Sequence, residues 1–170
     1  GAVGGKELLE RPTGVAVSRD GSRIYIVDTG GVDSENHHVV VFSPQGEHLF
    51  TIGKRGSGEG EFNLPLNATV GPDDTLYVVD GGNFRIQAFT PLGKYKFSIG
   101  AVGTRSGQFA RPKGVAVDAN GSIYVSDAAF GNFQIFNPKG QLLMWVGSRG
   151  LDNQPGKYLL PSGIGIDQTD

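Results

Sequence analysis

The chain has 170 residues, a formal net charge of −2 at pH 7 and no cysteine. This length allows one domain with a hydrophobic core, and the charge argues against a protein that binds nucleic acid over its whole surface. The lack of cysteine excludes disulfides, thiolate nucleophiles and cysteine-ligated zinc, and no apolar run is long enough to cross a membrane.

The high content of turn-forming residues predicts an all-β fold. The chain contains 28 Gly and 9 Pro, with no collagen-like period. No segment places apolar residues at helical spacing over three turns. We therefore expect little or no helix.

The first third of the chain contains three characteristic phrases, each with the pattern of a short strand. They are PTGVAV at 12–17, IYIVD ending at Asp28, and VVVFSPQG ending at Gly46; a fourth short strand ends at Gly53. Asp20-Gly21 lies between the first two, and Asp-Gly supplies the positive φ angles of tight hairpin turns. These phrases predict four antiparallel strands.

The same phrases return twice further along the chain. LYVVD ends at Asp80 and IYVSD at Asp127, and the closing glycine Gly53 is followed by Gly100 and Gly147, 47 residues apart each time. Asp28 and Asp80 are 52 residues apart because five extra residues follow Asp28. Two independent markers therefore give one period of about 47.

Four strands per period predict the fold class, because β-propeller blades have this composition and length. We expect an all-β chain forming a β-propeller of four-stranded antiparallel blades, in an arc whose two edge strands are unpaired. Since the phrase preceding a blade recurs at Gly1, we expect the chain to begin at the end of another blade, in a ring of at least five. The single partial propeller, 1–170, divides into a blade end at 1–11, complete blades at 12–53, 65–100 and 112–147, and the start of a further blade at 161–170.

The innermost strand of each blade should contain small residues, because blades converge at the axis. Its recurrent glycine is replaced once, by Asn67. Since Asn tolerates left-handed backbone best after Gly, we expect left-handed conformation at this position. We also expect six aromatic residues to pack between adjacent blades: Tyr25, Tyr77, Tyr124, Phe42, Phe89 and Phe136.

The phrases P-x-G-V-A-V, D-x-x-G-x-I-Y-V-x-D and N-x-R-I-Q-x-F resemble the NHL repeat, with 83–89 as the closest match to its third segment. The resemblance implies a six-bladed parent ring. The other blades read Asn36-His37-His38 and Phe130-Gly131-Asn132 there, so any role that the family gives this arginine is kept only at Arg85. EFNLPLNATV and AAFGNFQIFNPKGQLL are similar to exported bacterial propellers, some associated with c-type cytochromes. This similarity implies a periplasmic or extracellular location, with a cytoplasmic one left open, and a cytochrome-containing assembly as a partner.

Basic residues gather in the loops that we expect on one face of the propeller. Loops from an outermost strand to the next innermost strand share this face with loops from second to third strands, and loops carry much of protein function. An acidic partner or an anionic group is therefore the hypothesis, and ordinary solvated charge is the alternative, because Glu59 and Glu61 are interspersed. The candidate binding residues are His37, His38, Lys54, Arg55, Arg85, Arg105, Arg111 and Arg149.

One aspartate recurs at the same position in every blade, as Asp28, Asp80 and Asp127. Three carboxylates around a channel could bind Ca²⁺, which prefers oxygen ligands. An aspartate at a strand end more often accepts hydrogen bonds from backbone N–H groups of the adjoining turn. We favour the structural role.

The sequence supplies no catalytic constellation. There is no GxSxG elbow, and the adjacent His37 and His38 would point in opposite directions along a strand. Propeller lyases that cleave peptidylglycine intermediates resemble this repeat and place zinc-binding histidines at the start of the innermost strand, where this chain has Gly14, Asn67, Gly114 and Gly163. No metal ligand is therefore assigned, and a central Ca²⁺ or Zn²⁺ would require the complete ring.

Three functions follow from the sequence, in order of preference. The first is a non-enzymatic binding module that presents its loop face to a protein or polymer, with a protein partner or other chains completing the ring. The second is a metal-assisted hydrolase or lyase with a site at the propeller axis. RNA binding is third, because a dominant basic face with interleaved aromatics is absent.

Overall fold

The computed structural model describes residues 8–150 and 154–167, and in these ranges the chain is built almost entirely from strands. One 3-10 turn, η1 (Gly81–Asn83), interrupts them, in agreement with the expectation of little helix. Three antiparallel sheets have four strands each, joined in sequence order. Blade 1 contains β1 (Pro12–Val17), β2 (Ile24–Asp28), β3 (His38–Phe42) and β4 (His48–Ile52); blade 2 contains β5 (Pro65–Val70), β6 (Leu76–Asp80), β7 (Arg85–Phe89) and β8 (Tyr95–Ile99); blade 3 contains β9 (Pro112–Val117), β10 (Ile123–Asp127), β11 (Asn132–Phe136) and β12 (Leu142–Val146).

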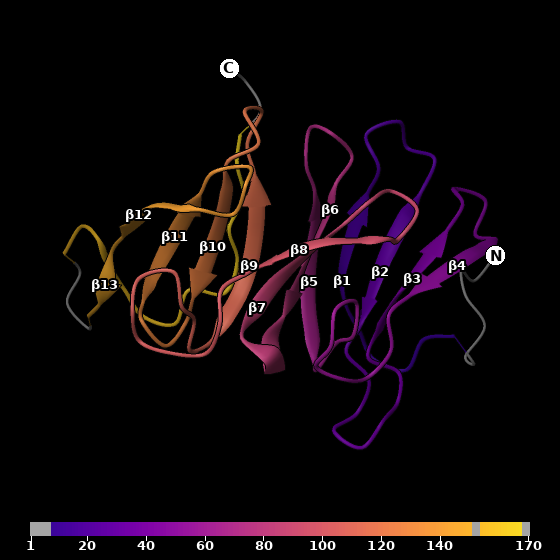
Figure 1. The fold of residues 1–170 in the computed structure, drawn as a ribbon, viewed down its shortest axis with the longest axis horizontal. Coiled ribbons are helices and arrows are strands. Elements are labelled where there is room, and N and C mark those ends of the chain that lie inside the picture. Colours follow the sequence, from indigo (N-terminus) through magenta and orange to yellow (C-terminus); the bar gives the residue numbers. More distant parts are fainter. Residues whose placement is uncertain (1–7, 151–153, 168–170) are drawn as a thin grey trace.

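The blades lie side by side in an arc (Figure 1). The innermost strand of blade 2, β5, packs between β1 and β9, the innermost strands of its neighbours. Four-stranded antiparallel blades arranged around their first strands are the architecture of a β-propeller. The predicted fold class is confirmed for this arc.

The repeated aspartate ends the second strand of each blade in the same register. Asp28 lies opposite Pro12 on β1 and His38 on β3. Asp80 and Asp127 occupy the equivalent places in their own blades. Each carboxylate is therefore held at the end of a blade where three strands and the incoming linker meet.

The expectation of left-handed backbone near the axis is wrong. Neither Gly14 nor Asn67 nor Gly114 has a positive φ. Close approach of neighbouring backbone explains the glycines instead: a Cβ at Gly14 would lie 2.9 Å from Asn67 Cα on β5, and one at Gly114 would lie 3.1 Å from the backbone nitrogen of Ile164 in the last described segment.

Two hydrophobic clusters fill the spaces between blades. One joins blades 1 and 2 and contains Tyr25 and Phe89, and the other joins blades 2 and 3 and contains Tyr77 and Phe136. The predicted packing between blades is confirmed for these four aromatic residues. The linkers contribute as well, since Phe62 lies 5.5 Å from Phe89, ring centre to ring centre.

The other two aromatic residues differ from the prediction. Phe42 is fully buried, yet it belongs to neither cluster between blades and its ring meets the edge of His48. Tyr124 is only half-buried and lines a cavity with Phe133 and Ile164. Both residues face sides of the arc where the described residues form no further blade.

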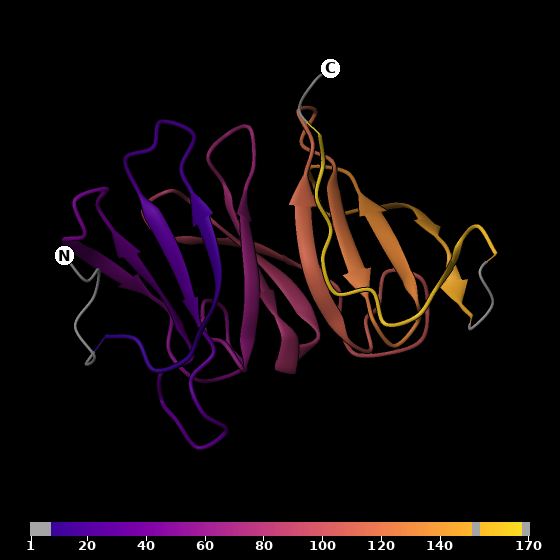
Figure 2. The ribbon, with the colours of Figure 1, turned by 180° about the vertical axis from the view of Figure 1, so that it is seen from behind.

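The last described segment runs beside β9 without forming a strand (Figure 2). The predicted start of a fourth blade at 161–170 is described only to residue 167. In each complete blade, the innermost strand (β1, β5 or β9) forms its hydrogen bonds with the strand that follows it in the chain. Just before this segment, β14 (Lys157–Tyr158) pairs in parallel with β13 (Ser148–Arg149). Most of the predicted blade end at 1–11 lies outside the described residues. Within those ranges no helix is long and apolar enough to span a membrane.

Candidate functional site

The repeated aspartates hold the linkers between blades. Asp28 accepts hydrogen bonds from the backbone N–H groups of Glu10 and Arg11, at 2.6 and 2.7 Å. Asp127 accepts equivalent bonds at 2.8 and 3.0 Å, from the two linker residues that precede blade 3. These contacts account for the recurrence of the aspartate, because each carboxylate ties an incoming linker to the second strand of its blade.

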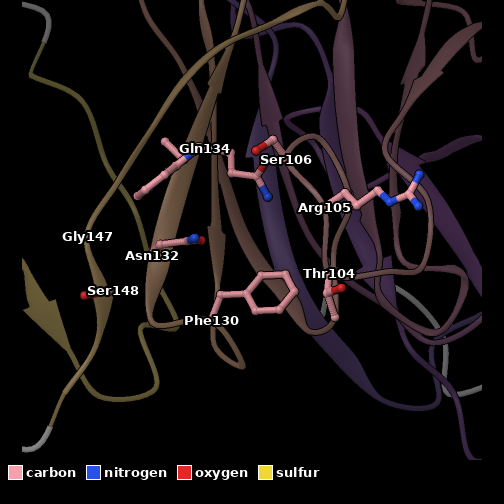
Figure 3. Close-up of a pocket in the computed structure, with 9 residues that line it drawn as sticks. Thr104, Arg105, Ser106, Phe130, Asn132, Gln134, Gly147 and Ser148 are labelled. Atoms are coloured by element: carbon pink, nitrogen blue, oxygen red, sulfur yellow. The ribbon is translucent and has the colours of Figure 1, made fainter.

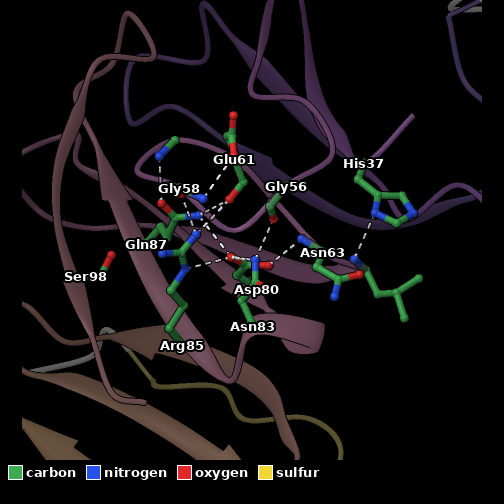
Figure 4. A network of polar contacts seen from close by, with 12 residues as sticks. His37, Gly56, Gly58, Glu61, Asn63, Asp80, Asn83, Arg85, Gln87 and Ser98 are labelled. Carbon is green, nitrogen blue, oxygen red and sulfur yellow. Dashed lines mark hydrogen bonds and ion pairs between the residues drawn. The ribbon is translucent and has the colours of Figure 1, made fainter. Parts of the chain in front are cut away.

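In blade 2 the same carboxylate is surrounded by side chains (Figure 4). Asp80 accepts one bond from the backbone of Asn63, at 2.7 Å, and others from the side chains of Asn83, Arg85 and Gln87. Burial raises the pKa of the Asp80 carboxyl, and the hydrogen bonds from Asn63, Asn83 and Arg85 oppose this shift. The site is a buried, internally satisfied polar network.

Arg85 is part of this network rather than a free surface cation. Its Nε donates to Asp80 Oδ2 at 2.8 Å, and its Nη2 donates to the carbonyl oxygens of Gly58 and Glu61, at 2.7 and 2.9 Å. The side chain is only 15% exposed. Arg85 therefore fills the space between β7 and the linker that precedes blade 2.

The two adjacent histidines also contact other parts of the chain rather than solvent. The backbone N–H of Leu64 donates to His37 Nδ1 at 3.3 Å, so Nε2 carries the proton and donates to the carbonyl of Gly31 at 3.0 Å. His37 is fully buried, and we remove it from the predicted binding surface. His38 Nε2 lies 3.7 Å from Asp28 Oδ2, in the place that Arg85 takes in blade 2.

The remaining predicted cations lie on the loop face, which we define as the side of the arc that carries the linkers between blades. Arg55 is half-buried, and its Nη1 donates to the carbonyl of Ser34 at 3.1 Å. Lys54 is largely exposed but lies 3.4 Å from Glu61 Oε1. The predicted residues that are exposed on this face are Lys54, Arg105, Arg111 and Arg149.

Blade 3 departs from blade 2 at the position of the buried arginine. Asn132 lies opposite Asp127, where blade 2 pairs Arg85 with Asp80. Asn132 Oδ1 is buried and has no hydrogen-bond partner within the described residues. A cavity of about 260 Å³ lies beside it (Figure 3).

The sequence interpretation missed the glutamine that follows in the third strand. Gln87 Oε1 accepts from the backbone of Gly60 at 3.0 Å, and Gln134 Oε1 accepts from Gly107 at 2.8 Å. Both glutamines bind the linker that enters their own blade. Their recurrence in IQAF and FQIF was the available signal.

No arrangement suited to a metal ion was found among the described residues, in which no three His, Cys, Asp or Glu residues gather as a ligand group. At the inner ends of the blades, Asn67 Oδ1 accepts a hydrogen bond from the backbone of Ala68 at 2.8 Å. The repeated aspartates lie at the linkers, where backbone and side-chain donors bind them. A structural role explains these groups without a cation.

Comparison with protein families identifies the repeat. Residues 9–42 and 109–136 match the model of the NHL repeat. These segments include the first three strands of blades 1 and 3. No curated protein sequence matches the chain.

Solved structures show the fold. A protein of unknown function from Bacteroides thetaiotaomicron aligns with a TM-score of 0.72 and 19% identity, over 96% of this chain and 44% of its own. An inactive variant of virginiamycin B lyase from Staphylococcus aureus, solved with quinupristin, gives 0.63 and 16%, over 90% and 44%. Hydrazine synthase from Kuenenia stuttgartiensis gives 0.58 and 19%, over 79% and 36%. The chain thus spans less than half the length of these proteins.

Proposed function

We propose that this chain, in which two blades contain NHL repeats of a β-propeller, is a non-enzymatic binding module that receives the acidic surface of a partner protein on its loop face. The observation that carries the proposal is the group of exposed arginines on that face, Arg105, Arg111 and Arg149. The salt bridges found among the described residues involve other groups, namely His38–Asp28, Lys54–Glu61, Arg85–Asp80 and Lys96–Asp73. Within the described residues, none of these ion pairs involves the three guanidinium groups, and guanidinium groups can bind carboxylates bidentately.

The backbone holds part of this group in place. The N–H of Arg111 donates to the buried Asp127 at 3.0 Å while its side chain remains exposed. Arg11 occupies the same place before blade 1, where its N–H donates to Asp28 at 2.7 Å. Two of the three blades thus have an arginine whose backbone is fixed at this place, which lowers the ordering cost of binding, whereas blade 2 has Leu64 there.

The opposite side of the arc carries the turns between the first and second and between the third and fourth strands of each blade, and we call it the turn face. Its charges are arranged differently. Three of its carboxylates accept hydrogen bonds within their own turns: Asp20 from Ser22, Asp73 from Thr75, and Asp118 from Ser122. Hydrogen bonds from Ser18 and Ser22 lower the pKa of Asp20 to about 2. The turn face therefore keeps a stable negative component and supplies a matched control surface.

The enzymatic and RNA-binding alternatives have less support. The lyase neighbour is 16% identical, which supports the fold alone, and the inner-strand positions Gly14, Asn67 and Gly114 carry no metal ligand. A periplasmic or extracellular location, and completion of the ring by further blades or other chains, remain parts of the proposal.

The test compares two charge-reversal variants of equal charge. One carries Arg105→Glu, Arg111→Glu and Arg149→Glu, and the control carries Arg19→Glu, Lys94→Glu and Lys139→Glu, exposed residues of the turn face. Fluorescence anisotropy with labelled poly-L-glutamate at low salt measures the affinity. The loss of affinity should be at least tenfold larger for the first variant than for the control. Equal losses, or tighter binding of single-stranded RNA than of poly-L-glutamate by the unmodified chain, would contradict the proposal.

A further inference from the structure

Blade 3 contains a cavity at the place where, in blade 2, the side chain of Arg85 forms hydrogen bonds with the linker. It has a volume of about 260 Å³ and opens between β11, the end of β12 and the linker that enters the blade (Figure 3). Its lining includes Arg105, Ser106, Phe130, Asn132, Gln134 and Trp145.

The cavity exists because a short side chain replaces a long one. In blade 2, the guanidinium of Arg85 crosses from β7 to the linker and binds the carbonyl oxygens of Gly58 and Glu61. Asn132 starts from the same register position in blade 3. Its amide ends after two carbons, so the volume that a guanidinium would occupy beside the linker is left open.

The shortened side chain also leaves a polar atom without a partner. Asn132 Oδ1 is buried and accepts no hydrogen bond from any described residue. The neighbouring amide does not supply one: Gln134 Oε1 accepts from Gly107, and its Nε2 donates to the carbonyl of Gln108. A buried acceptor without a donor costs free energy. Oδ1 has less than 1 Å² of accessible surface, so the amide must first turn about its soft terminal torsion before a ligand hydroxyl in the cavity can satisfy it.

An exposed aromatic residue lies at the mouth of the cavity. Trp145 pairs with Gln134 in the β11–β12 ladder and is 56% exposed. In the other blades the equivalent position holds Thr51, opposite Val40, and Ser98, opposite Gln87. Blade 3 therefore places an indole where the repeat otherwise has a small polar side chain.

The charges around the cavity favour a neutral ligand. The only charged lining residue is Arg105, and its guanidinium points away from Phe130 and Asn132 (Figure 3). No carboxylate lines the cavity. Its volume is below the roughly 300–1,000 Å³ typical of sites for drug-sized ligands, so it suits one small ring.

We propose that this cavity binds one neutral sugar ring of a glycan. The C–H face of the ring packs against the indole of Trp145, since aromatic side chains offer a large apolar face beside polar groups. Once the Asn132 amide turns toward the cavity, a sugar hydroxyl donates to its Oδ1, and other hydroxyls bind Ser106. This inference goes beyond the proposed function, because it requires neither an acidic partner nor the exposed guanidinium groups.

Trp145 is the only tryptophan of the chain, so its fluorescence reports on the cavity directly. Cellohexaose, maltohexaose and chitohexaose serve as neutral probes, and hexagalacturonate as the acidic one. At least one neutral hexaose should give a saturable blue shift or quenching of the emission. At about 0.5 M salt, which screens the exposed arginines of the loop face, hexagalacturonate should give at least tenfold weaker binding.

The matched variant is Asn132→Arg, which restores the residue of blade 2 and fills the cavity with a side chain that blade 2 already accommodates. It should keep the thermal unfolding midpoint and lose sugar binding at least tenfold. Asn132→Leu, which keeps a similar size but removes the acceptor, provides a second test if the arginine variant does not fold. Trp145→Ser, followed by calorimetry, should weaken binding to a similar extent.

Three results would overturn the inference. They are no emission change with any neutral hexaose at about 10 mM, neutral-hexaose binding that the folded Asn132 variants retain, and tighter binding of hexagalacturonate at about 0.5 M salt. Poly-L-glutamate binding by the same variants separates this outcome from failure of the proposed function, because Asn132→Leu changes no charge on the loop face.

Discussion

The same phrase, PxGVAV, is buried in blade 3 and exposed in blade 1. Val115 and Val117 are 4% and 5% exposed, whereas Val15 and Val17 are 63% and 51% exposed. In blade 3 these side chains belong to the cluster shared with blade 2, but no described residues form a blade against the equivalent face of β1. The neighbouring blade, rather than the strand's own residues, determines burial.

The outer strands show the same difference at the other end of the arc. Phe50 and Phe97 pack against the two clusters between blades. Met144 has their register position in blade 3, opposite Ile135, and is 54% exposed. The arc therefore combines two closed interfaces with two open faces, and each pair of equivalent residues offers a controlled test of that contrast.

The largest expected effect is at the interface between blades 1 and 2. Phe89→Ala removes a ring that is 1% exposed and packs against Phe62, so it should lower the free energy of unfolding by roughly 3–5 kcal/mol. Met144→Ala, at the open face, should change it by less than about 1 kcal/mol. Urea denaturation measures both, and a loss below about 1 kcal/mol for Phe89→Ala would contradict its placement.

The second comparison concerns the polar network. Arg85→Ala leaves the buried Asp80 without its cation and should cost roughly 3 kcal/mol. Asn132→Ala, at the same register position in blade 3, removes an amide whose oxygen has no partner among the described residues, and should cost less than about 1 kcal/mol. Equal costs in urea denaturation would show that blade 3 depends on this position as blade 2 does.

A smaller effect is expected at the innermost strands. Val115→Ala removes two buried methyl groups and should cost about 1.6 kcal/mol, taking roughly 0.8 kcal/mol for each. Val15→Ala should remain within about 0.5 kcal/mol of the unmodified chain. Thermal unfolding of the two variants side by side tests whether burial alone separates them.

The last prediction concerns the ionisation of Tyr77 at high pH, which does not change the stability at neutral pH. Burial raises the pKa of Tyr77 to about 12, so its neutral phenol stabilises the fold fully below about pH 10 and this contribution is lost as pH rises through about 12. Ultraviolet titration should show an ionisation step near pH 12 that Tyr77→Phe removes and that Tyr124→Phe leaves in place. If Tyr124→Phe removes that step, the contrast between interface and open face fails.

The sequence predicted the parts of the fold that repeat. The glycines 47 residues apart and the aspartates at strand ends located the blades, because every blade needs the same turns and the same tie to its linker. The left-handed prediction at Gly14 failed since close approach of two backbones and a positive φ both select glycine, and sequence alone does not distinguish them.

The candidate site was less predictable because its residues depart from the repeat. Arg85 and His37 looked like surface cations in the sequence, but hydrogen bonds to distant linker backbone turn them inward. Trp145 and Asn132 differ from their equivalents in the other blades, and a position-by-position comparison of the repeats would have marked both. The cavity beside Asn132 can be recognised only by comparison with blade 2, where the longer side chain of Arg85 extends to the linker.

Thiol labelling tests the contrast between interface and open face most directly, because the chain contains no cysteine. Val15→Cys and Val115→Cys place single thiols at equivalent positions of β1 and β9. We predict that Val15→Cys reacts with a disulfide reagent nearly as fast as in the unfolded chain, and that Val115→Cys reacts on the order of a hundredfold more slowly. Equal rates for the two thiols would contradict the account.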